Sequence, residues 1–208
     1  MPHPWFEIWL IHPAPEACAA FERRFAGRPD VRTLAQRYEQ LPPHDCFVTA
    51  GNAYGVMTAG IDAAIIARFG TELMREVQDH IMERYLGEQP VGSAFILPTG
   101  DRERPYLCHA PTMRMPGPIA NTSNVYAATF AALTAAHRYN VEHDGELRTL
   151  VFPAMGTGFG QVDFDEAARQ MAVAHAHYLR PPGHPTWDGL IARERRICYD
   201  GDTRMVNR

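Results

Sequence analysis

The 208-residue sequence contains no lysine, because all 20 of its basic residues are arginine. This absence excludes the phosphate-binding lysine of a Walker A loop, a Schiff-base lysine and a serine–lysine dyad. Serine is almost as scarce. Ser93 and Ser123 are the only two, and neither lies in the Gly-x-Ser-x-Gly turn of the common serine hydrolases. Any chemistry of this protein must therefore use other groups.

Other absences narrow the class of protein further. No apolar run approaches the ~18 residues of a membrane span, and the chain does not start like a signal peptide. The formal net charge of -4 offers no basic field to a nucleic-acid backbone. Cys18, Cys46, Cys108 and Cys198 are widely spaced, which favours buried thiols over a metal site. We expect a cytoplasmic protein without metal, cofactor, membrane contact or sequence-specific nucleic-acid binding.

Short apolar segments alternate with amphipathic ones along the chain, which predicts strands separated by helices. The predicted strands are 6–11, 31–35, 46–50, 94–97, 106–109 and 150–152, and the predicted helices are 15–25, 62–69, 72–85, 124–137, 165–179 and 187–199. The loop between 97 and 106 reads as a hairpin, so one pair of strands is antiparallel. The pattern predicts an α/β fold, a three-layer α/β/α sandwich with a mixed central sheet.

Two glycine-bearing turns, 52–62 and 153–160, each leave a strand and enter a helix. Such turns present backbone N–H groups at a helix N-terminus, where the dipole also favours an anion. The Gly156-x-Gly158-x-Gly160 spacing differs from the dinucleotide fingerprint, whose third glycine comes one residue later and whose ribose-binding acid follows about twenty residues on. No acid occurs from Ala167 to Trp187, so we expect these glycines to serve another anion.

Together these segments resemble the macro domain family of ADP-ribose-binding modules. Asp45-Cys-Phe-Val-Thr-Ala-Gly-Asn52 is similar to the family's Asp-Ala-Ile-Val-Asn-Ala-Ala-Asn, and Gly60-Ile61-Asp62 to its following Gly-Val-Asp. Leu150-Val-Phe-Pro-Ala-Met-Gly-Thr-Gly-Phe-Gly160 is similar to its second phosphate loop, and Tyr106-Leu-Cys-His109 to the strand between the loops. The resemblance implies one domain over 1–208, with a family-like core at 46–179 and an extension at each end.

The resemblance also implies roles for individual residues. Asn52 and Asp62 match the residues that hydrolytic members place at the distal ribose, which makes them the catalytic candidates. A helix dipole would keep Asp62 ionised, although a helix-capping acid is the alternative. Phe159 matches the aromatic residue over the distal ribose, with a core position as its alternative, and Glu39 is the nearest acid for the adenine. The remaining expected ligand-binding residues are Ala50, Gly51, Gly60, Ile61, Met155, Gly156, Thr157, Gly158 and Gly160.

Two functions remain open from the sequence. One is a hydrolase that removes a group from the distal ribose of ADP-ribose, whose substrate is a mono-ADP-ribosylated protein or an O-acyl ester. The other is a non-catalytic reader of ADP-ribose. The ten-residue step from Asn52 to Asp62 favours the enzyme, whereas replacement of the family's glycine run by Met57-Thr58-Ala59-Gly60 favours the reader.

Overall fold

A six-stranded sheet forms the centre of the computed structural model, which describes residues 6–198. The strands are β1 (Glu7–Ile11), β2 (Val31–Leu34), β3 (Cys46–Thr49), β4 (Phe95–Pro98), β5 (Tyr106–His109) and β6 (Thr149–Pro153). Their order across the sheet is β2-β1-β6-β3-β5-β4. All neighbours are parallel except β4 and β5, which form the predicted antiparallel hairpin. The ends of five parallel strands therefore meet at one edge of the sheet.

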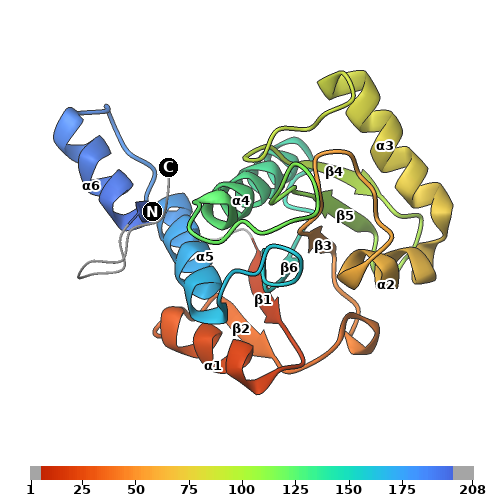
Figure 1. Ribbon diagram of the computed structural model, residues 1–208, viewed down its shortest axis with the longest axis horizontal. Coiled ribbons are helices and arrows are strands. Elements are labelled where there is room, and N and C mark those ends of the chain that lie inside the picture. Colours follow the sequence, from red (N-terminus) through yellow and green to blue (C-terminus); the bar gives the residue numbers. More distant parts are fainter. Residues whose placement is uncertain (1–5, 199–208) are drawn as a thin grey trace.

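Helices cover both faces of this sheet. They are α1 (Pro15–Arg24), α2 (Gly60–Phe69), α3 (Thr71–Tyr85), α4 (Asn124–Glu142), α5 (Phe164–Leu179) and α6 (Trp187–Cys198), with a short 3-10 helix, η1 (Tyr38–Gln40). Figure 1 shows α1, α4 and α5 on one side and α2 and α3 on the other, while α6 projects beyond α5. This is the predicted three-layer α/β/α sandwich with a mixed sheet.

The alternation of side chains along β1 explains why both faces are covered. Ile8 and Leu10 pack with α1, α4 and α5, whereas Trp9 and Ile11 pack with α2 and α3. Because successive residues of a strand point to opposite faces, a strand that is apolar at every position needs a helical layer on each side.

The sequence predicted every strand and α-helix within a few residues of its observed bounds, with one larger difference, and it did not predict η1. Helix α4 continues to Glu142, five residues beyond the predicted end at His137. Asn140 holds this last turn, since its buried side-chain amide donates to the Leu147 carbonyl and accepts from the Leu147 N–H, both at 2.8 Å. Tyr199, the predicted end of the last helix, lies outside the described residues.

Within residues 6–198, no helix combines the length and the apolar character that crossing a bilayer requires.

Candidate functional site

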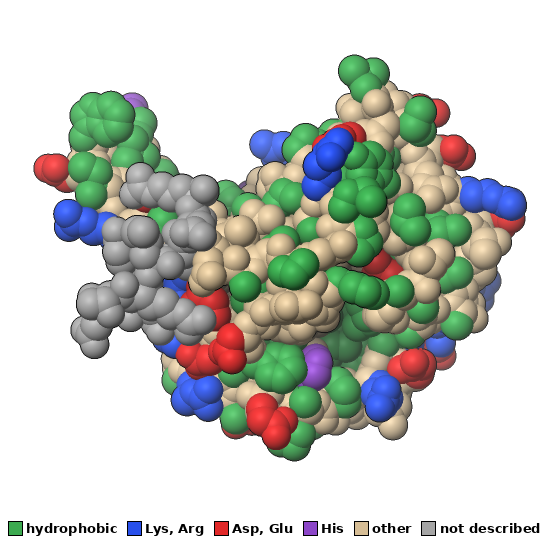
Figure 2. Space-filling model, in the orientation of Figure 1, with side chains coloured by type: hydrophobic (Ala, Val, Ile, Leu, Met, Phe, Trp, Pro, Cys, Tyr) green, Lys and Arg blue, Asp and Glu red, His purple; other side chains and the backbone are tan. Residues whose placement is uncertain are grey.

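A cavity of about 510 Å³ opens at the carboxyl ends of the parallel strands. Ligands of open α/β sheets collect at this edge. Figure 2 shows the hollow near the middle of one face, bordered mainly by hydrophobic side chains and backbone. Both glycine-bearing loops contribute to its wall. The lining includes Ala50, Gly51, Asn52, Gly60, Ile61, Asp62, Gly156, Thr157, Gly158, Phe159, Gly160 and Glu39, all expected from the sequence.

Asn52 shapes the first loop through its own side chain. The Nδ2 group donates to the Val56 carbonyl at 2.8 Å, and Oδ1 accepts from the N–H groups of Tyr54 and Val56. These bonds close a turn in which Asn52 is only 7% exposed. Its backbone also forms a bridge to Met113, which lines the same cavity. Asn52 therefore lines the cavity, while its side-chain amide forms its hydrogen bonds within the first loop.

Asp62 lies in the first turn of α2, beside the first loop, and is 8% exposed. The Thr49 hydroxyl, at the end of β3, donates a hydrogen bond to its Oδ1. Burial raises the pKa of Asp62 from 3.8 to about 6, while the Thr49 hydrogen bond opposes this change. Burial, which the sequence analysis did not consider for Asp62, therefore acts against the ionised form that the helix dipole favours. The carboxyl is ionised at neutral pH and protonates in mild acid.

The capping alternative for Asp62 does not hold either. The N-cap residue of α2 is Ala59, and no side chain caps this terminus. The first-turn amides of the helix have no intrahelical acceptor.

The residues that replace the family's glycine run differ in where their side chains lie. The side chain of Met57 is buried in the core with α3 and does not enter the cavity. Of the residues that replace the family's glycine run, Thr58 and Ala59 line the cavity.

The three glycines of the second loop have different physical roles. Gly156 has φ +75°, and a Cβ there would come within 2.8 Å of Val125. A Cβ on Gly160 would come within 2.3 Å of the Gly156 carbonyl oxygen. These two positions require glycine for the turn itself. Gly158 has an ordinary φ, and a Cβ there would meet nothing within 4 Å, because this residue faces the cavity.

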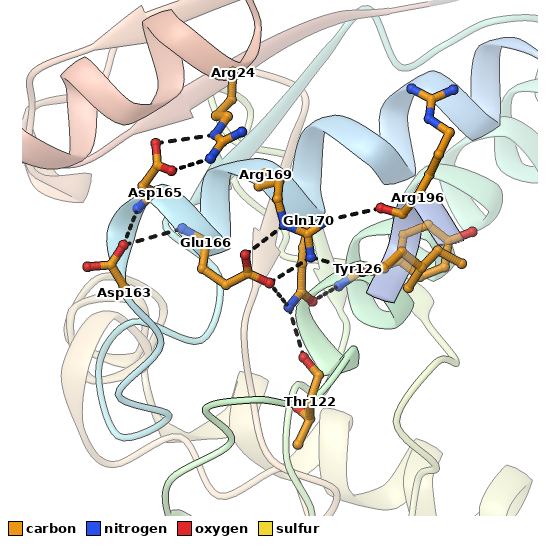
Figure 3. A network of polar contacts seen from close by, with 10 residues as sticks. Arg24, Thr122, Tyr126, Asp163, Asp165, Glu166, Arg169, Gln170 and Arg196 are labelled. Carbon is orange, nitrogen blue, oxygen red and sulfur yellow. Dashed lines mark hydrogen bonds and ion pairs between the residues drawn. The ribbon is translucent and has the colours of Figure 1, made fainter. Parts of the chain in front are cut away.

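A buried polar network supports the second loop from behind (Figure 3). Glu166 and Arg169 form a two-fold ion pair with N–O distances of 2.6 and 2.7 Å, and both side chains are 5% exposed. Gln170 donates to Glu166 and to the Thr122 carbonyl. One turn before Thr122, the Ile119 N–H donates to the Gly160 carbonyl at 2.8 Å. The network thus connects the interior of α5 to the loop that lines the cavity.

Phe159 is 57% exposed at the cavity wall, which excludes its alternative position in the core. Met155 is the one expected ligand-binding residue that does not line the cavity. Its side chain is fully buried in the core that α1, α4 and α5 cover.

The end of the cavity formed after β1 and β2 contains residues that the sequence analysis missed. His12 and Arg37 line it together with Glu39. Their position in the sequence could have predicted this, because polar residues that follow parallel strands lie at the edge of the sheet where ligands bind. Tyr38, which precedes Glu39, is 3% exposed and packs between Phe47 and Arg104, so its ring has little free surface for stacking on a base.

Residues 6–198 contain no group of three or more His, Cys, Asp or Glu side chains that could hold a metal ion. The two histidines of α5 contact other side chains of the protein. The Nε2 atom of His175 lies 2.8 Å from Oδ2 of Asp30, and Nδ1 of His177 lies 3.1 Å from the Tyr126 hydroxyl. The side chains of Cys18, Cys46, Cys108 and Cys198 are buried, as predicted.

Comparison with known protein families identifies the family of this chain. The family model described as Macro domain matches residues 48–171, more than half of the sequence. The chain therefore belongs to the macro domain family, as the two loops predicted. An uncharacterised protein of Aquifex aeolicus is 34% identical over 162 residues, which cover 78% of this chain and 85% of that protein. A macro domain-containing protein of Listeria monocytogenes is 26% identical over 156 residues, covering 75% and 82%.

Solved structures share the fold. The Oceanobacillus iheyensis macrodomain with ADP has a TM-score of 0.56 and 22% identity, and the match covers 67% of this chain and 72% of that one. A variant of the same macrodomain, solved with ADPR, has a TM-score of 0.54 at 22% identity and covers 67% and 73%. The macrodomain of Mycobacterium tuberculosis DarG has a TM-score of 0.52 at 20% identity, with coverage of 65% and 83%.

Proposed function

We propose that this protein binds ADP-ribose in the cavity and hydrolyses a group attached to the distal ribose. The observation that supports binding is a set of unpaired amides around one hollow. Within residues 6–198, the N–H groups of Gly158, Phe159 and Gly160 donate no backbone hydrogen bond. The first-turn amides of α2 add a second set with no helical acceptor. Converging N–H groups of this kind bind the oxygens of a pyrophosphate.

Asp62 supports the hydrolytic part of the proposal. Its pKa of about 6 leaves it ionised at neutral pH yet close to the range where general acid–base groups are effective. At the cavity wall it would orient a water molecule or a ribose hydroxyl toward the scissile bond. Asn52 would contribute by holding the first loop in shape, so Asn52→Ala should weaken both binding and turnover.

A binding-only reader of ADP-ribose is the second candidate. Its supporting observation is the side chain of Asn52, whose oxygen and nitrogen both bond within their own loop. Thr58 and Ala59, which line the cavity where the family has glycine, favour it as well. A reader needs the cavity and the amides but no acid.

Calorimetry with ADP-ribose, AMP and NAD tests the binding step. We expect ADP-ribose to bind and the other two to bind much more weakly, because both loops close on a pyrophosphate only when a compact distal ribose also enters. Equal affinities for AMP and ADP-ribose would contradict the two-loop site. Arg37 is the only arginine among the described residues of the wall, so affinity should fall only modestly with salt.

Turnover separates the enzyme from the reader. Asp62→Ala should keep most of the ADP-ribose affinity, yet slow the release of product from a mono-ADP-ribosylated protein or O-acetyl-ADP-ribose by about a hundredfold or more. Asp79→Ala, an exposed acid on α3, is the matched control and should change neither quantity. Wild-type protein that binds ADP-ribose tightly but releases no product during long incubation would establish the reader instead.

We also propose that the protein works in the cytoplasm on an ADP-ribosylated substrate. Four widely spaced and buried cysteines, Cys18, Cys46, Cys108 and Cys198, support a reducing compartment.

A further inference from the structure

A buried contact ties the end of β3 to the start of α2, across the first loop. Thr49 is the last residue of β3 and is completely buried, and its hydroxyl donates to Oδ1 of Asp62. In the described part of the chain, no other side chain hydrogen bonds to this carboxyl. Among the described residues, Thr49 therefore provides the one side-chain donor to the carboxylate.

The backbone and the side chain of Thr49 are both held in place. Its backbone lies in the β3–β5 pairing opposite His109, and its carbonyl accepts from the Ala110 N–H at 3.2 Å. A β-branched side chain has few rotamers at a strand position. Any other rotamer would bury an unsatisfied hydroxyl, which costs free energy because water does not reach it. The position of the donor is thus set by the sheet.

Among the described residues, no charged side chain pairs with the carboxylate of Asp62, so the Thr49 hydroxyl is the group that stabilises its negative charge. On the cavity side, the ionisable residues of the wall besides Asp62 are His12, Arg37, Tyr38 and Glu39. On α2 itself, Arg68 is ion-paired with Asp101 and Glu103. The exposed Glu72 and Arg75 of α3 pair with each other. Burial and the Thr49 hydroxyl are the two causes that act on the pKa of Asp62, the first raising it and the second lowering it.

We propose that Thr49 is a positioning residue for Asp62: its hydroxyl fixes Oδ1 against the sheet and leaves Oδ2 to face the ligand. The contact orients the carboxylate and also stabilises its ionised form, so it sets the pH at which the site becomes active. This inference rests on the proposed hydrolase for its effect on turnover, but the contact itself is testable without activity.

The direct test measures the pKa of Asp62 from the ¹³C chemical shift of its side-chain carboxyl during a pH titration. Thr49→Val keeps the shape of the side chain and removes the donor, and it should raise this pKa by about one pH unit. Thr49→Ser keeps the donor and should restore a value near that of the wild type. Thr129→Val is the matched control, because Thr129 is another buried threonine whose hydroxyl bonds within α4, away from the cavity.

The pH dependence of turnover provides the second readout. With its pKa one unit higher, Asp62 in Thr49→Val should lower turnover about fivefold at pH 6 and leave it almost unchanged at pH 8. The affinity for ADP-ribose at pH 8 should match that of the wild type. A merely structural role for Thr49 would lower stability or affinity at every pH and would not move the acidic limb of the profile.

The outcomes are distinct from those that test the proposed function. An Asp62 pKa that is the same in Thr49→Val and wild type would overturn the positioning role, whether or not the protein is an enzyme. A raised pKa in a protein without turnover would support the positioning role and refute the hydrolase. If Thr49→Val fails to fold, Thr49→Ala removes the same hydroxyl without placing a second methyl group against the carboxyl, and the same shift is expected.

Discussion

Replacing Asp62 with asparagine should stabilise the protein at neutral pH, because the wild-type side chain is held where its charge is disfavoured. Asp62 is 8% exposed, and burial raises its pKa from 3.8 to about 6. Between these values the unfolded chain loses the Asp62 proton while the folded chain keeps it. The free energy of unfolding of the wild type therefore falls as pH rises through this window. Asparagine has no proton to lose, has nearly the same shape and can still accept from Thr49.

The size of the effect follows from the two pKa values. Ionisation of Asp62 costs the folded wild type about 1 kcal/mol at about pH 4.5 and about 3 kcal/mol at about pH 7.5. The free energy of unfolding of Asp62→Asn, relative to wild type, should therefore increase by about 2 kcal/mol between these two conditions. This change with pH is the prediction, because it is independent of any constant difference between an amide and a neutral carboxyl.

Urea unfolding of both proteins at a series of pH values measures this difference. Burial lowers the pKa values of His44, His109 and His177, but these groups are present in both proteins, so their contributions cancel in the difference. Asp79→Asn, at an exposed position, should show no change with pH relative to wild type. A constant stability difference between Asp62→Asn and wild type across the series would refute the reasoning and return Asp62 to its ordinary pKa.

Three further substitutions, two of them paired with a comparison variant, test the cavity and its support. Gly158→Val should abolish ADP-ribose binding and leave the unfolding transition in place, whereas Gly160→Val should destabilise the fold, because only the second added Cβ meets backbone; an unfolded Gly158→Val would make this glycine structural. Phe159→Ala should weaken ADP-ribose binding by ~1–2 kcal/mol in calorimetry, the scale of an aromatic contact, and an unchanged affinity would remove the ring from the site. Arg169→Met should lower the free energy of unfolding by about 3–5 kcal/mol, since it leaves a buried carboxylate unpaired. Arg75→Met breaks an exposed pair and should cost less than about 1 kcal/mol, so equal losses in the two arginine variants would contradict the role of burial.

Much of the fold could be predicted because its signals are local. The strand Tyr106–His109 and the start of α1 at Pro15 follow from apolar runs and from a proline at a helix start. The end of α4 could not be predicted, since it depends on Asn140 bonding to the backbone of Leu147 across a turn. After the helix, the chain turns through Asp144 and Gly145, both with positive φ. Glycine and, less strongly, aspartate favour this left-handed conformation, but neither residue shows how far the helix before them extends.

The candidate site, like the fold, could be predicted only in part. Its two loops were recognisable because glycine spacing is a local property of the chain. His12 and Arg37 were missed because they reach the cavity only through the strand order, in which β1 lies between β2 and β6. Met155 was misplaced for a related reason, since membership of a loop does not determine which side of it faces the core.

The pKa of Asp62 depends on burial, which the local sequence does not show, and this has a physical consequence. A helix N-terminus alone favours a carboxylate, yet this carboxyl is buried with one hydroxyl as its donor and no cation paired to it among the described residues. Such an arrangement lowers stability at neutral pH, while an asparagine at the same position would avoid the cost. Stability therefore does not account for the acid, and this supports the role proposed for Asp62 at this wall of the cavity. Burial raises the pKa, Thr49 limits how far it rises, and together they keep Asp62 ionised at neutral pH but able to exchange a proton near it.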